Sequence, residues 1–330
     1  MNRSHLYLVT GAGGYVGSFV TKLLLEQGYK VRAMIRNPNQ AAELEALAAE
    51  VVIADMKDVD SLRKAVTGVQ GVFHIAGLFR QAGLPESEFD AVNAVGTRNL
   101  FEVSVAEGVS RVIHCSTVGV IEPKQDVPST EEDPYSPADM YQRSKMDGEK
   151  LALEFYQSGT ISGVVIRPAM IYGPGDDRTL KMFKMISKGH FFYVGKGNKL
   201  VHWIDVRDLA KAFLLAMQHE ERNAEIYIIP GKKPVALKGM ADLIADKLST
   251  KRPWLHLPVV PMQLLGDVCE AVCTPLKINP PIFRRRVDFY TKSRNFDGSK
   301  AKEHLGFEPS QSLSQELDDI IKSYKLMNLI

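Results

Sequence analysis

The sequence predicts an α/β fold, a doubly wound parallel sheet with a smaller region after it. Short apolar runs alternate with helical stretches through the first half of the 330-residue chain, which is typical of stacked strand–helix–strand units. A glycine-rich turn stands between the first apolar run and the first helical stretch, as at the start of such a unit. With 45% hydrophobic residues, a chain of this length can bury a large core.

The expected elements follow one another in the order that a Rossmann sheet requires. Strands are predicted at 6–10, 30–35, 51–54, 71–75, 112–115 and 163–167, and helices near 15–27, 59–67, 87–107 and 139–158. Beyond residue 172 the pattern changes to turns marked by glycine and proline, at 173–175, 195–197 and 279–281. A helix over 206–218 and a strand over 225–229 are expected to rejoin the sheet.

This order predicts two interleaved units. The first is a Rossmann domain over residues 1–172, with 201–230 rejoining it. The second is a smaller C-terminal substrate-binding region over 173–200 and 231–330.

Composition fits a soluble enzyme. The formal net charge of +2 gives no reason to expect nucleic acid as a partner. The apolar run at 6–9 is too short for a secretory segment or a membrane span, so we expect a cytoplasmic protein with no membrane partner. Cys115, Cys269 and Cys273 occur in no metal-binding or Cys-x-x-Cys spacing, so no metal site or disulfide framework is predicted.

The glycine-rich turn is the candidate nucleotide site. Small residues between a strand and a helix let the backbone approach a pyrophosphate, and the helix N-terminus offers N–H groups and a favourable dipole. A tight turn without a ligand is the alternative. The residues expected at the cofactor are those of the turn itself, Gly11, Gly13, Gly14, Tyr15, Val16 and Gly17.

The end of the second strand predicts which dinucleotide binds. NAD enzymes usually carry an acidic residue there, but this chain has Arg36, with Arg32 on the same strand face. A guanidinium suits a 2'-phosphate, so NADP (NADPH) is favoured over NAD; a solvated arginine is the alternative. Asp55, after the third strand, is a candidate partner for the adenine amino group, and an exposed loop aspartate is the alternative there.

Tyr141 and Lys145 form the candidate catalytic pair. Residues four apart share one helix face, so the ammonium of Lys145 is expected to favour the ionised form of the phenol. Tyr141 is therefore a candidate acid/base near neutral pH. Taken alone, the two residues fit an ordinary amphipathic helix equally well.

Together these motifs resemble the extended short-chain dehydrogenase/reductase family, and the resemblance covers nearly the whole chain. It rests on the glycine motif at 10–17, the strand at 72–77, Asn-x-x-Gly-Thr at 93–97, Tyr-x-x-x-Lys at 141–145 and Arg-Pro-Ala-x-Ile-Tyr-Gly-Pro-Gly at 167–175.

The resemblance implies roles for the site residues. Tyr141 exchanges a proton with the substrate oxygen, Thr117 hydrogen-bonds that oxygen, and Lys145 also holds the nicotinamide ribose. Ser116 is the second choice for the hydroxyl. Six further residues are expected at the cofactor, Met56, Ala76, Gly77, Asn93, Pro168 and Met170.

Substrate class divides this family. Sugar-nucleotide members usually carry asparagine where Met170 stands, and a thioether cannot replace that amide donor. The segment at 31–38 resembles the dihydroflavonol reductase branch, and that at 294–309 resembles 3β-hydroxysteroid dehydrogenase-like members. We therefore expect an NAD(P)-dependent oxidoreductase that interconverts a ketone and a secondary alcohol.

Two other functions stay open. A nucleotide-sugar epimerase or dehydratase with bound NAD is the main alternative, because Arg284–Arg286 offers a diphosphate clamp, although a solvated basic run is the commoner case. A non-catalytic dinucleotide sensor is the third, and the intact Tyr141 and Lys145 argue against it.

Three further expectations concern partners and packing. Apolar residues in the C-terminal region suggest a hydrophobic small-molecule substrate, although core packing explains them equally well; they are Phe183, Phe191, Phe192, Trp254 and Leu255. Many relatives are homodimers, and the helical run at 100–105 is the candidate interface. His202 and Asp205 are expected to cap and position the following helix.

Overall fold

A computed structural model describes residues 1–81, 83–273, 287 and 290–330. Its centre is a seven-stranded sheet in the order β11–β6–β5–β4–β1–β2–β3, with every neighbouring pair parallel. The doubly wound α/β fold is thus confirmed. The strands are β1 (Leu6–Thr10), β2 (Lys30–Ile35), β3 (Glu50–Ile53), β4 (Gly71–His74), β5 (Arg111–Cys115), β6 (Ser162–Pro168) and β11 (Glu225–Ile229).

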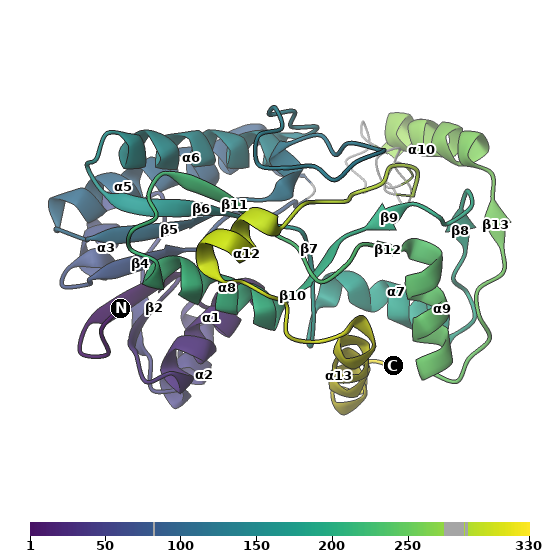
Figure 1. Cartoon of the computed structure of the whole chain (residues 1–330), viewed down its shortest axis with the longest axis horizontal. Coiled ribbons are helices and arrows are strands. Elements are labelled where there is room, and N and C mark those ends of the chain that lie inside the picture. Colours follow the sequence, from purple (N-terminus) through teal and green to yellow (C-terminus); the bar gives the residue numbers. More distant parts are fainter. Residues whose placement is uncertain (82, 274–286, 288–289) are drawn as a thin grey trace.

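Helices cover both faces of the sheet (Figure 1). Along the strands, side chains alternate between two cores: Leu8 and Val72 belong to one, and Val9 and Phe73 to the other. Burial on both faces explains why the strands are continuous apolar runs in the sequence. One face carries α3 (Val59–Val66), α5 (Gly96–Ala106) and α6 (Met140–Gln157), and the other carries α1 (Tyr15–Glu26), α8 (Val206–Gln218) and α12 (Ser299–Leu305).

Two parts of this half differ from the prediction. The helix expected at 87–107 is three consecutive segments, α4 (Glu86–Asp90), a π-helical turn η2 (Ala91–Val95) and α5. Between β2 and β3 the chain forms a 3-10 turn η1 (Pro38–Gln40) and helix α2 (Ala41–Ala46), which were not predicted. Helix α2 is short, and the Asn-Pro-Asn that precedes it reads as a loop.

The chain after Tyr172 builds a second region with its own core. The predicted turns are present, since Gly173, Gly175, Gly195 and Gly197 all have positive φ. Three helices form this core, α7 (Asp177–Ser187), α9 (Leu237–Lys247) and α13 (Leu313–Leu326). They were not predicted, because each buries its apolar face against segments far away in the sequence. Helix α10 (Val259–Cys273) lies at the outer end of this region (Figure 1).

Three small two-stranded sheets join the two regions and extend the second. They pair β7 (Met170–Tyr172) with β10 (Trp203–Asp205), β9 (Leu200–Val201) with β12 (Val235–Ala236), and β8 (Tyr193–Val194) with β13 (His256–Leu257). Strand β11 pairs with β6, and α12 packs against both β11 and α8. The division of the chain into two units stays a prediction.

Some expectations fall on residues that the structure does not describe, namely the turn at 279–281 and the basic run Arg284–Arg286. In the part of the chain that it does describe, no helix is both long enough and apolar enough to cross a membrane.

Candidate active site

The glycine turn follows β1 and packs tightly against its neighbours. Gly11 has φ +67°, and a Cβ there would lie 2.9 Å from the Cα of Ala76, at the end of β4. A Cβ on Gly17 would lie 2.1 Å from the carbonyl oxygen of Gly11. Only glycine therefore lets α1 begin this close to β1 and β4.

Helix α1 begins without help from a side chain. Its N-cap is Gly14, and among the described residues no side chain caps its first-turn N–H groups. A helix N-terminus of this kind is suited to an anionic group such as a pyrophosphate. The turn thus fits a dinucleotide, because a Cβ would fill the cradle and its backbone donors have no side-chain partner.

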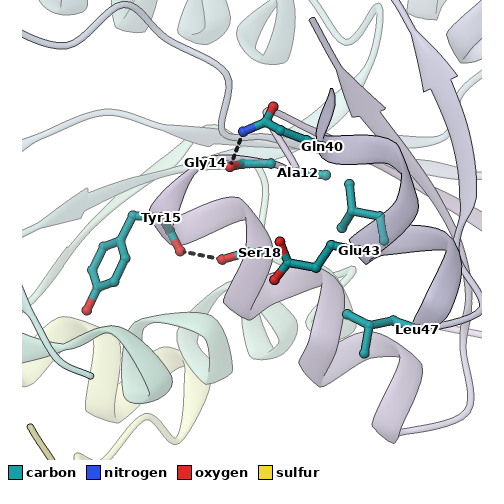
Figure 2. A pocket seen from close by; sticks show the side chains of 9 residues that line it. Ala12, Gly14, Tyr15, Ser18, Gln40, Glu43 and Leu47 are labelled. Atoms are coloured by element: carbon teal, nitrogen blue, oxygen red, sulfur yellow. Dashed lines mark hydrogen bonds between the residues drawn. The ribbon is translucent and has the colours of Figure 1, made fainter. Parts of the chain in front are cut away.

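A pocket of about 240 Å³ lies beside this turn (Figure 2). Gln40 forms one wall, because its Nε2 donates to the carbonyl oxygen of Gly13 (2.9 Å). Ser18, Glu43 and Leu47 also line the pocket. The adenosine half of a dinucleotide approaches a Rossmann sheet at this position, beside the glycine turn and the end of β2.

The two arginines of β2 behave differently. Arg36 is exposed just after the strand and makes no hydrogen bond or ion pair with any residue the structure describes. Arg32 instead donates to Glu50 Oε1 (2.7 Å) and to the carbonyl oxygens of Ala65 and Thr67. The guanidinium of Arg32 is therefore held by β3 and by the end of α3, and Arg36 is the freer of the two arginines.

The loop after β3 is fixed by a carboxylate–backbone hydrogen bond and by packing against α5. The Asp55 carboxylate accepts a hydrogen bond from Lys57 N (2.9 Å). Met56 is buried against Gly96, where a Cβ would lie 2.7 Å from that of Met56. The predicted contacts of Asp55 and Met56 with the cofactor stay predictions.

Asn93 holds together two parts of the site. Its Oδ1 accepts from Leu78 N (2.7 Å), and its Nδ2 donates to Leu78 O (3.0 Å) and to Ser144 Oγ (2.9 Å). It therefore fixes the loop after β4 against α6. The sequence suggested a direct cofactor contact for Asn93 and missed this positioning role, because both partners are distant in the chain.

Helix α6 carries the candidate catalytic pair to the ends of the central strands. Asp139 caps it, with Oδ1 accepting from Gln142 N (2.6 Å). Lys145 Nζ donates to the carbonyl oxygen of Cys115 at the end of β5 (2.5 Å). It also lies 3.8 Å from where a Cβ of Gly77 would be. The helix thus places Lys145 between the ends of β4 and β5.

A buried ion pair anchors the same helix face one turn further on. Glu149 and Arg167 are both fully buried, and Arg167 donates to Glu149 through Nε (3.1 Å) and Nη2 (2.5 Å). The Tyr135 hydroxyl donates to Glu149 as well (2.7 Å). Removing one partner of such a pair typically costs about 3–5 kcal/mol. This anchor was not predicted from the sequence, although its glutamate follows Lys145 by four residues.

Tyr141 is surrounded by an aromatic ring and a cation. The Phe79 ring lies edge-on at 5.1 Å between centroids, and the Arg80 guanidinium lies 5.0 Å from the Tyr141 ring. Burial raises the pKa of Tyr141 above its ordinary value, while the charges of Arg80 and Arg178 act to lower that pKa.

The expected effect of Lys145 on Tyr141 is wrong for this arrangement. The ammonium faces the Cys115 carbonyl, and Lys145 is not among the main influences on the pKa of Tyr141. Burial also lowers the pKa of Lys145 itself. Spacing alone therefore predicted which residues share a face, but not the balance of burial and charge at the phenol.

Thr117 and Ser116 occupy different surroundings. Thr117 caps a 3-10 turn η3 (Val118–Val120), with Oγ1 accepting from Gly119 N (3.1 Å), and it is partly exposed. Ser116 is buried, and its Oγ has no hydrogen-bond partner in the described part of the chain. Thr117 is thus the more accessible hydroxyl of the two, and its catalytic role stays a prediction.

Comparison with known proteins decides the family. The model of the NAD dependent epimerase/dehydratase family matches residues 7–229. The chain belongs to this family. The match spans the glycine turn, Thr117, Tyr141 and Lys145, and the resemblance to extended short-chain dehydrogenases/reductases is confirmed.

Individual relatives are similar over nearly the whole length. A putative dihydroflavonol 4-reductase of Synechocystis sp. is 29% identical over 326 residues, covering 96% of this chain and 93% of the relative. A 4-hydroxy-2-methyl-3-oxo-4-farnesyl-3,4-dihydroquinoline-1-oxide ketoreductase of Stigmatella aurantiaca is 25% identical over 316 residues, covering 94% of each. Among solved structures, gox2253 is similar to this chain, with 27% sequence identity and a TM-score of 0.83 over 99% of each chain.

The remaining expected cofactor residues lie around the turn and the end of β6. Val16 is half-buried in the first turn of α1, and Pro168 is buried at the end of β6. The Tyr15 hydroxyl donates to Pro174 O (3.3 Å), which ties α1 to the second region. Met170 begins β7 and donates its N–H to His202 O (3.0 Å).

The predicted role of Asp205 is confirmed. It caps α8, with Oδ1 accepting from Arg207 N (2.8 Å). His202 lies directly before β10, and its Nε2 lies 2.9 Å from Gly231 O, so it does not cap α8.

Two expectations rested on apolar residues. Phe183 and Phe191 are buried in the core of the second region, so core packing explains them, whereas Trp254 is 81% exposed and Leu255 is 41% exposed. A hydrophobic substrate stays a prediction. Leu100 and Phe101 are fully buried against the central sheet, so these two side chains are not available to a dimer interface, and a homodimer stays a prediction.

Proposed function

We propose that this protein is an NADP(H)-dependent oxidoreductase that interconverts a ketone and a secondary alcohol. The observation that carries this proposal is that α6 brings Tyr141 and Lys145 to the same strand ends as the glycine turn, with Lys145 beside Gly77 and Gly11 beside Ala76. An acid/base and a dinucleotide turn at one edge of a parallel sheet suit hydride and proton transfer. The ketoreductase among the relatives agrees with this reaction class.

The chain's own residues supply the proton and the orientation. When bound, the dinucleotide supplies or accepts a hydride. A tyrosine phenol is protonated at neutral pH, and burial raises the pKa of Tyr141 further, so the phenol can donate a proton to a substrate oxygen during reduction. Thr117 would hydrogen-bond that same oxygen and Lys145 would hold the cofactor ribose, while the N–H groups of the α1 first turn would hold the pyrophosphate.

The proposal of NADP rests on Arg36. Its guanidinium is exposed after β2 with no described partner, so it is available to a 2'-phosphate. The carboxylate of Glu43 lines the neighbouring pocket and would repel a 2'-phosphate, so it limits the preference that Arg36 gives. We therefore expect a preference for NADPH over NADH of about tenfold, which corresponds to about 1.4 kcal/mol.

The first experiment identifies the dinucleotide that co-purifies and then measures NADPH and NADH affinities by calorimetry on stripped protein. Arg36→Ala should remove the preference, whereas Arg98→Ala, which changes an exposed arginine on α5, should leave it intact. Tightly retained NAD with no such preference would contradict the proposal. It would favour the nucleotide-sugar epimerase or dehydratase, against which Met170 now argues.

A further inference from the structure

Two arginines from different regions both lie near the ring of Phe79, which contacts Tyr141. Arg80 belongs to the loop after β4, and Arg178 belongs to the first turn of α7. Their guanidinium carbons lie 5.6 and 5.9 Å from the centroid of the Phe79 ring. Arg80 also lies 5.0 Å from the Tyr141 ring, and Arg178 lies 5.2 Å from the Tyr15 ring. Two cations thus stand at one exposed phenylalanine beside the candidate acid/base.

Each guanidinium is held in place through its Nε, and Arg178 is held through its Nη2 as well. Arg80 Nε donates to Asp139 Oδ2 (3.1 Å), and Arg178 Nε donates to Asp176 Oδ1 (2.7 Å). The two carboxylates are themselves the N-caps of α6 and α7. Because helix N-termini are rigid and capped, these pairs orient the arginines without occupying all of their donors.

Most of the terminal guanidinium nitrogens remain available to a ligand. The exception is Arg178 Nη2, which donates to Ile171 O (3.2 Å). Arg178 Nη1 and both terminal nitrogens of Arg80 make no hydrogen bond with any part of the chain that is described. Each side chain is about 40% exposed, at 40% for Arg80 and 41% for Arg178. Both guanidinium groups are therefore accessible to solvent.

The capping contacts also limit how far the aspartates neutralise the arginines. Asp139 accepts from Gln142 N, and Asp176 accepts from both Thr179 N and Thr179 Oγ1. Part of each carboxylate charge is thereby balanced by a helix N-terminus. Burial is the main influence on the pKa of Tyr141 and raises it; the charges of Arg80 and Arg178 act to lower that pKa, and the charge of Asp139 acts to raise it.

We infer that Arg80 and Arg178 bind an anionic group of the substrate, a carboxylate or a phosphate, next to the carbonyl or alcohol that reacts at Tyr141. Guanidinium forks match these groups with paired N–H donors. The exposed face of Phe79 then packs against the apolar part of the same molecule. The inference rests on the proposed function only in taking Tyr141 as the reacting group.

The test is binding to the protein saturated with whichever dinucleotide it retains. The probes are benzoate, phenyl phosphate and neutral benzamide, measured by calorimetry. We expect benzoate or phenyl phosphate to bind at least tenfold more tightly than benzamide. Arg80→Gln and Arg178→Gln should each remove most of that difference, and the preferred anion separates a carboxylate substrate from a phosphate substrate.

Controls make the outcome decisive. Arg98→Gln removes an exposed arginine on α5 and should change nothing; an equal loss there would overturn the inference, as would equal affinities for benzoate and benzamide in the unaltered protein. If a glutamine variant does not fold, Arg80→Lys and Arg178→Lys keep the positive charge but lose the paired N–H donors of the guanidinium. Unchanged benzoate affinity in both lysine variants would also overturn it.

Turnover separates the two proposals. Anion binding that depends on the arginines, with no ketone reduced by NADPH or NADH, would defeat the proposed reaction and leave the inference standing. Reduction of neutral ketones without any preference for anionic ligands would support the proposed reaction and overturn the inference about the arginines.

Discussion

Helices α1 and α7 both begin at the candidate active site, but their first turns are satisfied differently. Helix α1 starts at Gly14 with no side-chain cap, whereas Asp176 caps α7 by accepting from Arg178 N (3.3 Å) and Thr179 N (3.2 Å). Of these two helices, α1 is therefore the one whose N-terminal N–H groups have no side-chain cap among the described residues. On the α1 side the backbone is suited to recognise a ligand, and on the α7 side the side chains are.

This difference follows from what each side has to hold. A dinucleotide pyrophosphate is the same in every reaction, and backbone N–H groups at a glycine turn recognise it at no cost in side-chain ordering. Substrate groups vary, and the α7 side offers arginines held by capping aspartates. Four changes test whether the two sides divide the work in this way.

The largest expected effect is on chemistry and not on either helix. Tyr141→Phe should lower the turnover rate by about 100- to 10,000-fold, because it removes the proton donor. Dinucleotide affinity, measured by calorimetry, should stay within about twofold, since the phenol takes no part in the α1 turn. If Tyr141→Phe loses dinucleotide affinity instead, Tyr141 contributes to cofactor binding.

A pH effect on stability is expected on the α7 side. Glu316 of α13 is buried and accepts a hydrogen bond from Tyr172, at the end of β7. Burial, with the charges of Asp205 and Asp208, raises the pKa of Glu316 to about 7. The protonated form is thus favoured in the folded state.

The sign follows from linkage. The stability that Glu316 contributes is fully present below the ordinary pKa of a glutamate and is lost as the pH rises through about 7. Denaturant unfolding should therefore show a loss on the order of 2 kcal/mol between pH 4.5 and pH 7.5 from this group. Glu316→Gln should flatten that part of the profile, and an identical slope in both proteins would contradict the assignment.

Gly14→Asp gives α1 the kind of cap that α7 already has. The carboxylate should occupy the first-turn N–H groups and repel a pyrophosphate, so NADPH affinity should fall more than tenfold, or by about 1.4 kcal/mol or more. The matched control is Gly14→Ala, because either Cβ would lie 3.2 Å from Gly11 O. Equal losses in the two variants would show that crowding, and not the uncapped N-terminus, determines binding.

The smallest effect is the reverse change on α7. Asp176→Ala removes its cap and should lower the free energy of unfolding by about 1 kcal/mol. Thermal unfolding measures this loss, and NADPH affinity should not change. A loss of NADPH affinity equal to that of Gly14→Asp would mean that the two helix starts act as one site.

Much of the fold was determined by local sequence. Strands β1 and β2 begin and end where predicted, as do α8 and β11, because a strand buried on both faces is a short apolar run between turn signals. The glycine turn and the pair Tyr141 and Lys145 were predictable for a related reason. Their geometry is set by residues within one turn of chain.

Only the tertiary structure decided the rest, since the partners are far apart in the sequence. Asn93 meets Leu78 and Ser144, and Arg80 and Arg178 both lie near the ring of Phe79. The pKa of Tyr141 depends on burial and on those arginines more than on the neighbouring Lys145. Desolvation and long-range charge are properties of the folded surroundings, so no local pattern in the chain records them.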